Sequence, residues 1–430
     1  MKYRKFIRFD CFAYLKVFFA INIIQQCTDA TVQFQTFSRL KMELNRTSLV
    51  LTLVHIALSP IVEAFLTQNP VTQALCGLRT DQLIKYYGYE AEIHKVTTHD
   101  GYILTLFRCN SKNSSLSGER KSVIVQHGLL VSSDDFCINV PSQALAYVLA
   151  DAGYDIWLPN FRGSYYSRNH VSEDPNDLFG GYWNFSWYEM GIYDHPAVID
   201  YILKETGNEK LYYIGYSQGS TSIMVLLSEK PEYNAKIYAA SLMAPAVYMA
   251  GDGPIYQILS RFAPILQGIA STEFLPRSDL ISKLLILICS RDLNLCNAFV
   301  DLICGLSLDQ RNNTMLPAFV CHIPSGASLK QIIHYGQEIK YGFFGKYKYG
   351  VDIPEDFPLH RITAPISIHY SVADTLANAR DARILISKLK TKDLYSQEIQ
   401  GQFNHIDFVW GMNSASLIYT KILQFFDKYQ

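Results

Sequence analysis

Short apolar runs alternate with amphipathic segments through most of the chain. Six of these runs predict buried strands, at residues 102–107, 122–126, 154–158, 211–214, 237–243 and 366–370. Between them lie segments that predict helices, at residues 141–152, 196–205, 217–229 and 377–389. Short apolar strands separated by helices are typical of a parallel sheet that is covered on both faces. We therefore expect an α/β fold with a mostly parallel central sheet.

The alternation of strands and helices stops between about residues 246 and 360. That stretch is helical, irregular and punctuated by Pro and Gly, and it separates two strand–helix units. An insertion at such a place is typical of a helical cap over an α/β core. We expect the core to occupy residues 65–245 and 361–430, with the cap at 246–360 between them.

The N-terminal segment carries two patterns that resemble export signals. Basic residues precede an apolar stretch at 11–24, and a second pattern begins at Met42 with Arg46, an apolar core at 47–58 and Ala64. A basic residue, a short apolar core and a terminal small residue form a secretory signal. We expect residues 1–64 to be a leader, with a possible start at Met42 and cleavage after Ala64. A single long leader or an uncleaved anchor is the alternative.

The composition excludes several classes of protein. The 38 Lys and Arg nearly balance the 39 Asp and Glu, so the chain lacks the basic excess of a nucleic-acid-binding protein. A hydrophobic content of 49% with almost no net charge is incompatible with general disorder. The body has no run of about 20 apolar residues, which excludes a polytopic membrane protein.

The strongest candidate for chemistry is a G-x-S-x-G motif that follows the apolar run at 211–214 and opens a predicted helix. Gly215 and Gly219 permit a strained turn, because a larger side chain would collide with the neighbouring strand or helix. This turn lifts Ser217 above the sheet as a nucleophile. The backbone N–H of Gln218 then faces the position where an oxyanion develops.

A serine nucleophile needs a base and an acid, and on this kind of fold the three residues are expected in the order Ser, acid, His along the chain. His405 lies in a loop before a helix and is the candidate base, whereas His369 falls inside an apolar strand and is expected in the core. Asp374 follows the strand at 366–370 and is the candidate acid. Asp381 lies on the next helix, and Asp407 is too close to His405 in sequence to orient it.

A second oxyanion donor should follow the strand at 122–126. The segment His127-Gly-Leu-Leu130 occupies that position, and the N–H of Leu129 is the candidate donor. An ordinary tight turn at His127-Gly128 is the alternative interpretation.

Seven of the nine cysteines lie in the body, and none forms a CxxC pair. Cys289, Cys296 and Cys304 cluster, and an exported protein is expected to bridge two of them. Candidate glycosylation sequons stand at Asn113, Asn184 and Asn312.

Further segments distributed between residues 80 and 428 identify the family that this chain resembles. They include Val96-Thr-Thr-His-Asp-Gly-Tyr-Ile-Leu104, His127-Gly-Leu-Leu-Val-Ser-Ser133, Asn160-Phe-Arg-Gly163, Trp183-Asn-Phe-Ser-Trp187, Pro324-Ser-Gly-Ala-Ser328 and Asn404-His-Ile-Asp-Phe-Val-Trp-Gly411. Together with the serine motif they resemble the acid lipase family of animals, which includes gastric and lysosomal acid lipases and many insect lipases.

The resemblance implies an α/β-hydrolase with a mobile cap over an apolar cleft. It implies a secreted or lysosomal enzyme that cleaves triglycerides or steryl esters at a lipid–water interface through an acyl-enzyme, without metal or cofactor. A monomer with no nucleic-acid partner is expected. The resemblance also assigns the oxyanion hole to Leu129 and Gln218, and a bridge in the cap to Cys289 and Cys296, with Cys296–Cys304 as the alternative pairing.

Two departures from the family pattern bear on the site. Tyr216 stands where the family usually has His before the nucleophile, and the loop before Asp374 lacks the usual glycines. Two other functions compete with the lipase interpretation. One is a lipid-binding or storage protein that has kept the scaffold without the chemistry, and the other is a short-chain carboxylesterase.

Overall fold

The structure is a computed structural model that describes residues 70–111, 120–177, 180–249, 251, 254–307, 309–350 and 352–429. The predicted leader, including Met42 and Ala64, and the sequon at Asn113 lie outside the described residues. No helix among the described residues has the length and apolar character needed to span a membrane.

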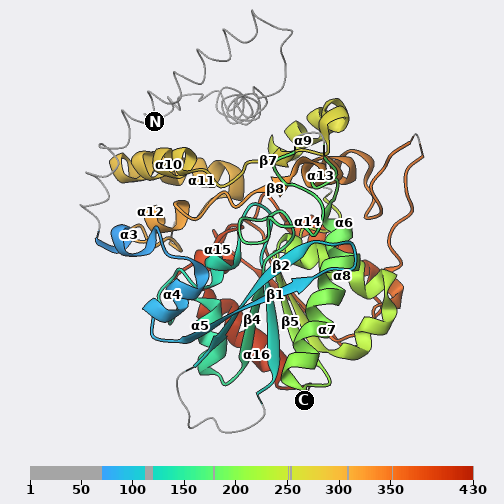
Figure 1. Cartoon of the computed structure of the whole chain (residues 1–430), viewed down its shortest axis with the longest axis horizontal. Coiled ribbons are helices and arrows are strands. Elements are labelled where there is room, and N and C mark those ends of the chain that lie inside the picture. The colour runs from blue at the N-terminus through green and yellow to red at the C-terminus, as the bar shows by residue number, and fades with distance from the viewer. Residues whose placement is uncertain are drawn as a thin grey trace, which may run out of the picture. The chain divides into compact units, whose positions relative to one another are not determined.

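An eight-stranded sheet forms the centre of the fold (Figure 1). Its strands, in spatial order, are β1 (Glu90–Thr97), β2 (Ile103–Asn110), β4 (Asp155–Pro159), β3 (Ser122–Gln126), β5 (Leu211–Tyr216), β6 (Ile237–Met243), β9 (Ile366–Ser371) and β10 (Leu394–Ile399). The pairs β1–β2 and β2–β4 are antiparallel, and the six strands from β4 to β10 run parallel. The mostly parallel sheet predicted from the apolar pattern is therefore confirmed.

Both faces of the sheet are covered, which explains the continuous apolar runs. In β3, Val123 and Val125 belong to one core cluster and Ile124 belongs to the other, because successive side chains point to opposite faces. One cluster packs under α5 (Leu145–Asp151) and α16 (Thr420–Phe426). The other packs under α7 (His195–Thr206), α8 (Gln218–Glu229) and α14 (Ala379–Lys388). Shorter helices are α3 (Pro70–Leu75), α4 (Thr80–Tyr86), α6 (Trp187–Glu189) and α15 (Asp407–Trp410).

The insertion predicted for residues 246–360 lies between β6 and β9 and is mainly helical (Figure 1). Its helices are α9 (Pro254–Leu266), α10 (Asp279–Arg291), α11 (Leu293–Cys304), α12 (Leu316–Val320) and α13 (Leu329–Tyr341). A two-stranded ribbon joins β7 (Glu273–Phe274) to β8 (Ala327–Ser328). We call this insertion the cap.

Two disulfides involve the cap. Cys289 pairs with Cys296 at the corner between α10 and α11, whereas Cys304 is a buried free thiol, so the alternative pairing with Cys304 is not the one present. The second disulfide, Cys76–Cys321, joins the segment after α3 to the end of α12 across 245 positions of sequence.

Candidate active site

Ser217 lies at a strained turn between β5 and α8, with φ 53° and ψ −115°. The two flanking glycines make this turn possible. A Cβ on Gly215 would lie 2.7 Å from the carbonyl carbon of Gly219, and a Cβ on Gly219 would lie 2.5 Å from the carbonyl oxygen of Gln126. Both distances are far below van der Waals contact, so these are the collisions expected from the sequence motif.

The structure brings the three predicted triad residues into one hydrogen-bonded chain. His405 Nε2 lies 2.9 Å from Ser217 Oγ, and His405 Nδ1 lies 2.7 Å from Asp374 Oδ2. The other carboxylate oxygen of Asp374 accepts the N–H groups of Leu376 and Ala377, each at 2.8 Å. These backbone donors fix the carboxylate, and the carboxylate in turn orients the imidazole toward the serine.

The neighbouring acidic and basic residues that are not expected in the triad have other partners. His369 is buried in β9, where it contacts Gln397, and burial lowers its pKa to about 4. Asp381 accepts from the Tyr256 hydroxyl at 2.8 Å. Asp407 accepts the N–H of Asn404 at 2.7 Å, and burial raises the pKa of this carboxyl to about 6.

The loop after β3 lies directly beside the nucleophile. A Cβ on Gly128 would be 3.0 Å from Ser217 Cβ, so a larger residue would press on the nucleophile. His127 holds the loop in place: its Nε2 accepts the Phe161 N–H at 3.0 Å, which leaves Nδ1–H to donate to Gly128 O at 2.8 Å. Burial lowers the pKa of His127 to about 4, so the ring is neutral and can make both bonds near neutral pH.

The two N–H groups assigned to the oxyanion hole belong to this region. Gln218 is the first residue of α8, and the first N–H groups of a helix have no acceptor within the helix. Leu129 precedes Leu130, which has φ 62°, a left-handed conformation that is costly for a leucine. The loop that carries Leu129 is therefore strained and needs support from its surroundings.

Tyr216, which departs from the family pattern, contacts the candidate base. Its hydroxyl donates to the backbone oxygen of His405 at 3.1 Å, and the two rings lie 5.2 Å apart between centroids. Burial raises the pKa of the Tyr216 phenol well above its ordinary value, so the hydroxyl stays protonated as a donor. Tyr216 therefore supports the loop that carries His405.

The end of α11 in the cap also contacts the loops that carry His405 and Asp374. His405 N–H donates to Cys304 O at 3.1 Å, and Asn404 Nδ2 donates to Gly305 O at 2.8 Å. Thr375, next to Asp374, donates through its hydroxyl to Ile303 O at 3.1 Å. The cap residues contribute backbone oxygens, which leave no side-chain pattern in the sequence, so sequence reasoning missed them.

The two sequons within the described residues differ in accessibility. Asn184 is exposed, whereas Asn312 is half-buried and its side chain accepts the Thr314 N–H at 3.1 Å. Among the described residues, no group of three His, Cys, Asp or Glu side chains is arranged to hold a metal ion.

Comparisons with known proteins show what the chain is similar to. Two family models match: a partial alpha/beta-hydrolase lipase region at residues 80–140 and the alpha/beta hydrolase fold at 121–294. Lipase 1 of Drosophila melanogaster is 37% identical, over 82% of this chain and 80% of the relative. Human gastric triacylglycerol lipase is 34% identical, over 80% of this chain and 90% of the relative. Lysosomal acid lipase/cholesteryl ester hydrolase of Macaca fascicularis is 31% identical, over 84% of this chain and 93% of the relative.

Solved structures support the fold. A crystal structure described as a lipase of Sulfolobus solfataricus matches with a TM-score of 0.57 at 14% identity, over 80% of this chain and 95% of that one. A soluble variant of monoglyceride lipase from Saccharomyces cerevisiae matches with a TM-score of 0.51 at 14% identity, over 78% of this chain and 94% of that one. At these identities the likeness concerns the α/β-hydrolase fold alone.

Proposed function

We propose that this chain, which belongs to the acid lipase family together with gastric, lysosomal and insect lipases, cleaves neutral-lipid esters with Ser217, His405 and Asp374. Family membership makes the chain a carboxylic ester hydrolase of the lipase type. The observation that carries the assignment of residues is the continuous chain of hydrogen bonds from Asp374 through His405 to Ser217.

In the first half of the reaction, Ser217 Oγ attacks the acyl carbon of the ester while its proton passes to His405 Nε2. Asp374 accepts the Nδ1–H bond, which keeps the correct tautomer and stabilises the imidazolium that forms. The negative charge on the former carbonyl oxygen is stabilised by the N–H groups of Leu129 and Gln218. Collapse of this intermediate breaks the bond to the alcohol oxygen, which takes the proton from His405.

In the second half, a water molecule attacks the acyl-enzyme. His405 accepts one proton of this water, the new bond forms at the acyl carbon, and the oxyanion again lies at the N–H groups of Leu129 and Gln218. The bond to Ser217 Oγ then breaks, the serine recovers its proton, and the carboxylic acid leaves. No metal or cofactor takes part in these steps.

The substrates are neutral lipids, namely triglycerides or steryl esters, presented at a lipid–water interface. The names of the relatives support this class, since one is a gastric triacylglycerol lipase and another a lysosomal acid lipase/cholesteryl ester hydrolase. We place the protein in the secretory pathway, as a secreted or lysosomal monomer. Glycosylation at Asn184 is consistent with the exposure of that side chain.

The full chain, expressed in a secretory host, tests this function with triolein, cholesteryl oleate and a soluble short-chain ester as substrates. A fluorophosphonate should label the wild-type protein at Ser217, as read by mass spectrometry of the modified peptide. Ser217→Ala should lose both labelling and hydrolysis. Folded protein that cleaves no ester would instead indicate a lipid-binding protein, and cleavage of the short-chain ester alone would indicate a carboxylesterase.

A further inference from the structure

The segment Pro324–Ser328 is one of those that carry the family resemblance, but it has no role in the chemistry described above. It belongs to the cap, and its Ser325 lies against the loop that carries Leu129. Ser325 N–H donates to Leu130 O at 2.7 Å, and Ser325 O accepts the Tyr165 N–H at 2.7 Å. Ser325 is fully buried between these two backbone partners. The cap thus contributes a backbone donor to the residue that follows Leu129.

Leu130 needs such a donor because of its backbone conformation. Its φ of 62° lies in the left-handed region, where a leucine persists only if its surroundings hold it. The hydrogen bond from Ser325 restrains the Leu130 carbonyl and, with it, the left-handed conformation of that residue. Leu129 directly precedes Leu130, and its N–H is the second oxyanion donor in the proposed mechanism.

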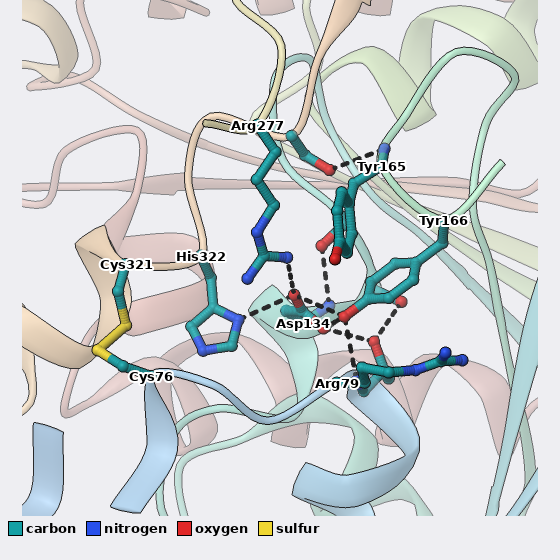
Figure 2. Close-up of polar contacts among 12 residues, drawn as sticks. Cys76, Arg79, Asp134, Tyr165, Tyr166, Arg277, Cys321 and His322 are labelled. Atoms are coloured by element: carbon teal, nitrogen blue, oxygen red, sulfur yellow. Dashed lines mark hydrogen bonds and ion pairs between the residues drawn. A yellow bond between two sulfur atoms is a disulfide. The ribbon is translucent and has the colours of Figure 1, made fainter. Parts of the chain in front are cut away.

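The same cap segment is anchored a second time at His322, three residues before Ser325 (Figure 2). His322 Nδ1 lies 2.9 Å from Asp134 Oδ2, and the other ring nitrogen lies 3.1 Å from Leu75 O. Arg277, also from the cap, reaches Asp134 Oδ2 at 3.4 Å. Figure 2 shows Arg277 and His322 pointing at Asp134 from the cap side, next to the Cys76–Cys321 disulfide.

Asp134 is held from the core side as well. Its carboxylate accepts from the Thr80 hydroxyl at 2.5 Å and from the Tyr166 hydroxyl at 2.9 Å. The carboxylate is fully buried, and it is matched by the cationic Arg277 and by the hydroxyls of Thr80 and Tyr166. Because these partners hold Asp134 in place, the cap segment cannot shift there without losing the buried contact between His322 and Asp134.

We propose, on the premise that Leu129 serves the oxyanion hole, that residues 321–325 form a strap that holds this donor in place. Ser325 is a positioning residue that acts through Leu130, and the His322–Asp134 contact fixes the other end of the strap. This part of the cap therefore stays docked during turnover.

Replacing Ser325 tests the strap because one variant removes the backbone donor and another keeps it. Ser325→Pro deletes the N–H, whereas Ser325→Ala retains the N–H and loses only the hydroxyl. Displacing a catalytic group by about 1 Å costs up to about 100-fold in rate. We therefore expect Ser325→Pro to lower kcat on a soluble short-chain ester about 10- to 100-fold. KM should stay within about threefold, and Ser325→Ala should remain near wild type.

A second substitution separates positioning of the loop from general stability. Glycine adopts a left-handed φ without cost, so Leu130→Gly combined with Ser325→Pro should recover at least tenfold of the lost kcat. A trifluoromethyl ketone forms an adduct that carries an oxyanion. Its affinity for Ser325→Pro should fall by the same factor as kcat. Equal kcat for Ser325→Pro and Ser325→Ala would overturn the strap, as would a loss that Leu130→Gly does not relieve.

If Ser325→Pro does not yield folded protein, His322→Ala loosens the strap at its other end. We expect kcat to fall about fivefold with little change in KM, and a lower Tm with unchanged kcat would refute the proposal. The wild-type protein distinguishes failure of the strap from failure of the proposed function. If the wild type cleaves no ester and is not labelled by the fluorophosphonate, the proposed function is wrong, and the strap proposal is wrong with it. An active wild type with unaffected variants refutes the strap alone.

Discussion

Gly305 connects the cap to the catalytic loops, and its replacement by alanine should damage catalysis more than stability. A Cβ at this position would lie 2.0 Å from the carbonyl oxygen of Ala373, the residue before Asp374. Carbon–oxygen contacts in proteins are rarely closer than about 3.3 Å, so one of the two backbones must move by about 1 Å. The Asp374 loop or the His405 loop moves with it, because Cys304 O accepts the His405 N–H.

The two costs can be estimated separately. A displacement of about 1 Å at a catalytic group costs about 100-fold in rate, so we expect Gly305→Ala to lower kcat by that factor. The backbone at Gly305 has φ 99° and ψ 168°, a region essentially restricted to glycine, which adds about 1–3 kcal/mol of strain. In a protein of this size that strain corresponds to a fall in Tm of a few degrees.

Gly342→Ala is the matched control. Gly342 follows α13 with φ 70° and ψ 34°, and a Cβ there would meet no atom of the described residues within 4 Å. This variant should lose about 1 kcal/mol of stability through its left-handed backbone and keep its kcat. The assay is hydrolysis of a soluble short-chain ester beside a thermal melt. The reasoning is refuted if Gly305→Ala keeps kcat within twofold, or if Gly342→Ala loses as much activity.

Three further changes probe hydrogen bonding and titration. Tyr216→Phe removes the hydrogen bond to the His405 carbonyl, which is worth about 1 kcal/mol, so kcat should fall about fivefold. Steady-state assays measure this fall, and an unchanged kcat would show that Tyr216 does not support the base. Among the described residues, neither carboxylate oxygen of the buried Glu338 has a hydrogen-bond partner. Burial raises the pKa of this carboxyl well above 4.5, so wild-type stability falls as the pH rises above that value. Glu338→Gln should therefore flatten the dependence of Tm on pH between 4.5 and 7, and parallel curves for the two proteins would contradict this. Burial alone would raise the pKa of Asp134, but His322 and Arg277 outweigh it and lower the pKa from 3.8 to about 2. Asp134→Asn should therefore lower the free energy of unfolding by about 2 kcal/mol near neutral pH. Denaturant melts of the two proteins should show this difference shrinking as the pH falls from 4 to 2. A difference that does not depend on pH would refute the assignment.

The strands that the sequence predicted are those buried on both faces. The sequence of β3 is Ser-Val-Ile-Val-Gln, and all five residues are buried, so the apolar run coincides with the strand. β1 and β10 were not predicted, and both are edge strands. β1 is exposed or half-buried at every position except Val96, so it needs no apolar run, and its charged residues suit an edge.

The same distinction explains which parts of the site could be predicted. Ser217, Asp374 and His405 each follow a strand or precede a helix, so local patterns locate them along the chain. The contacts of Gly305 and Ser325 join backbone groups over long stretches of sequence, and a backbone group has no residue type to recognise. The Cys76–Cys321 disulfide was missed for a related reason, since cysteine counts do not determine connectivity.

The Cys76–Cys321 disulfide turns most of the hydrolase into a covalent ring. The ring contains Ser217 but excludes Asp374 and His405, which follow its closing cysteine. A single protease cut inside the ring leaves both pieces joined through sulfur, so they migrate together on a non-reducing denaturing gel. A cut between Cys321 and Asp374 releases a smaller fragment that carries the acid and the base. Comparing reducing and non-reducing gels after limited proteolysis therefore locates each cut relative to the ring, before any peptide is sequenced.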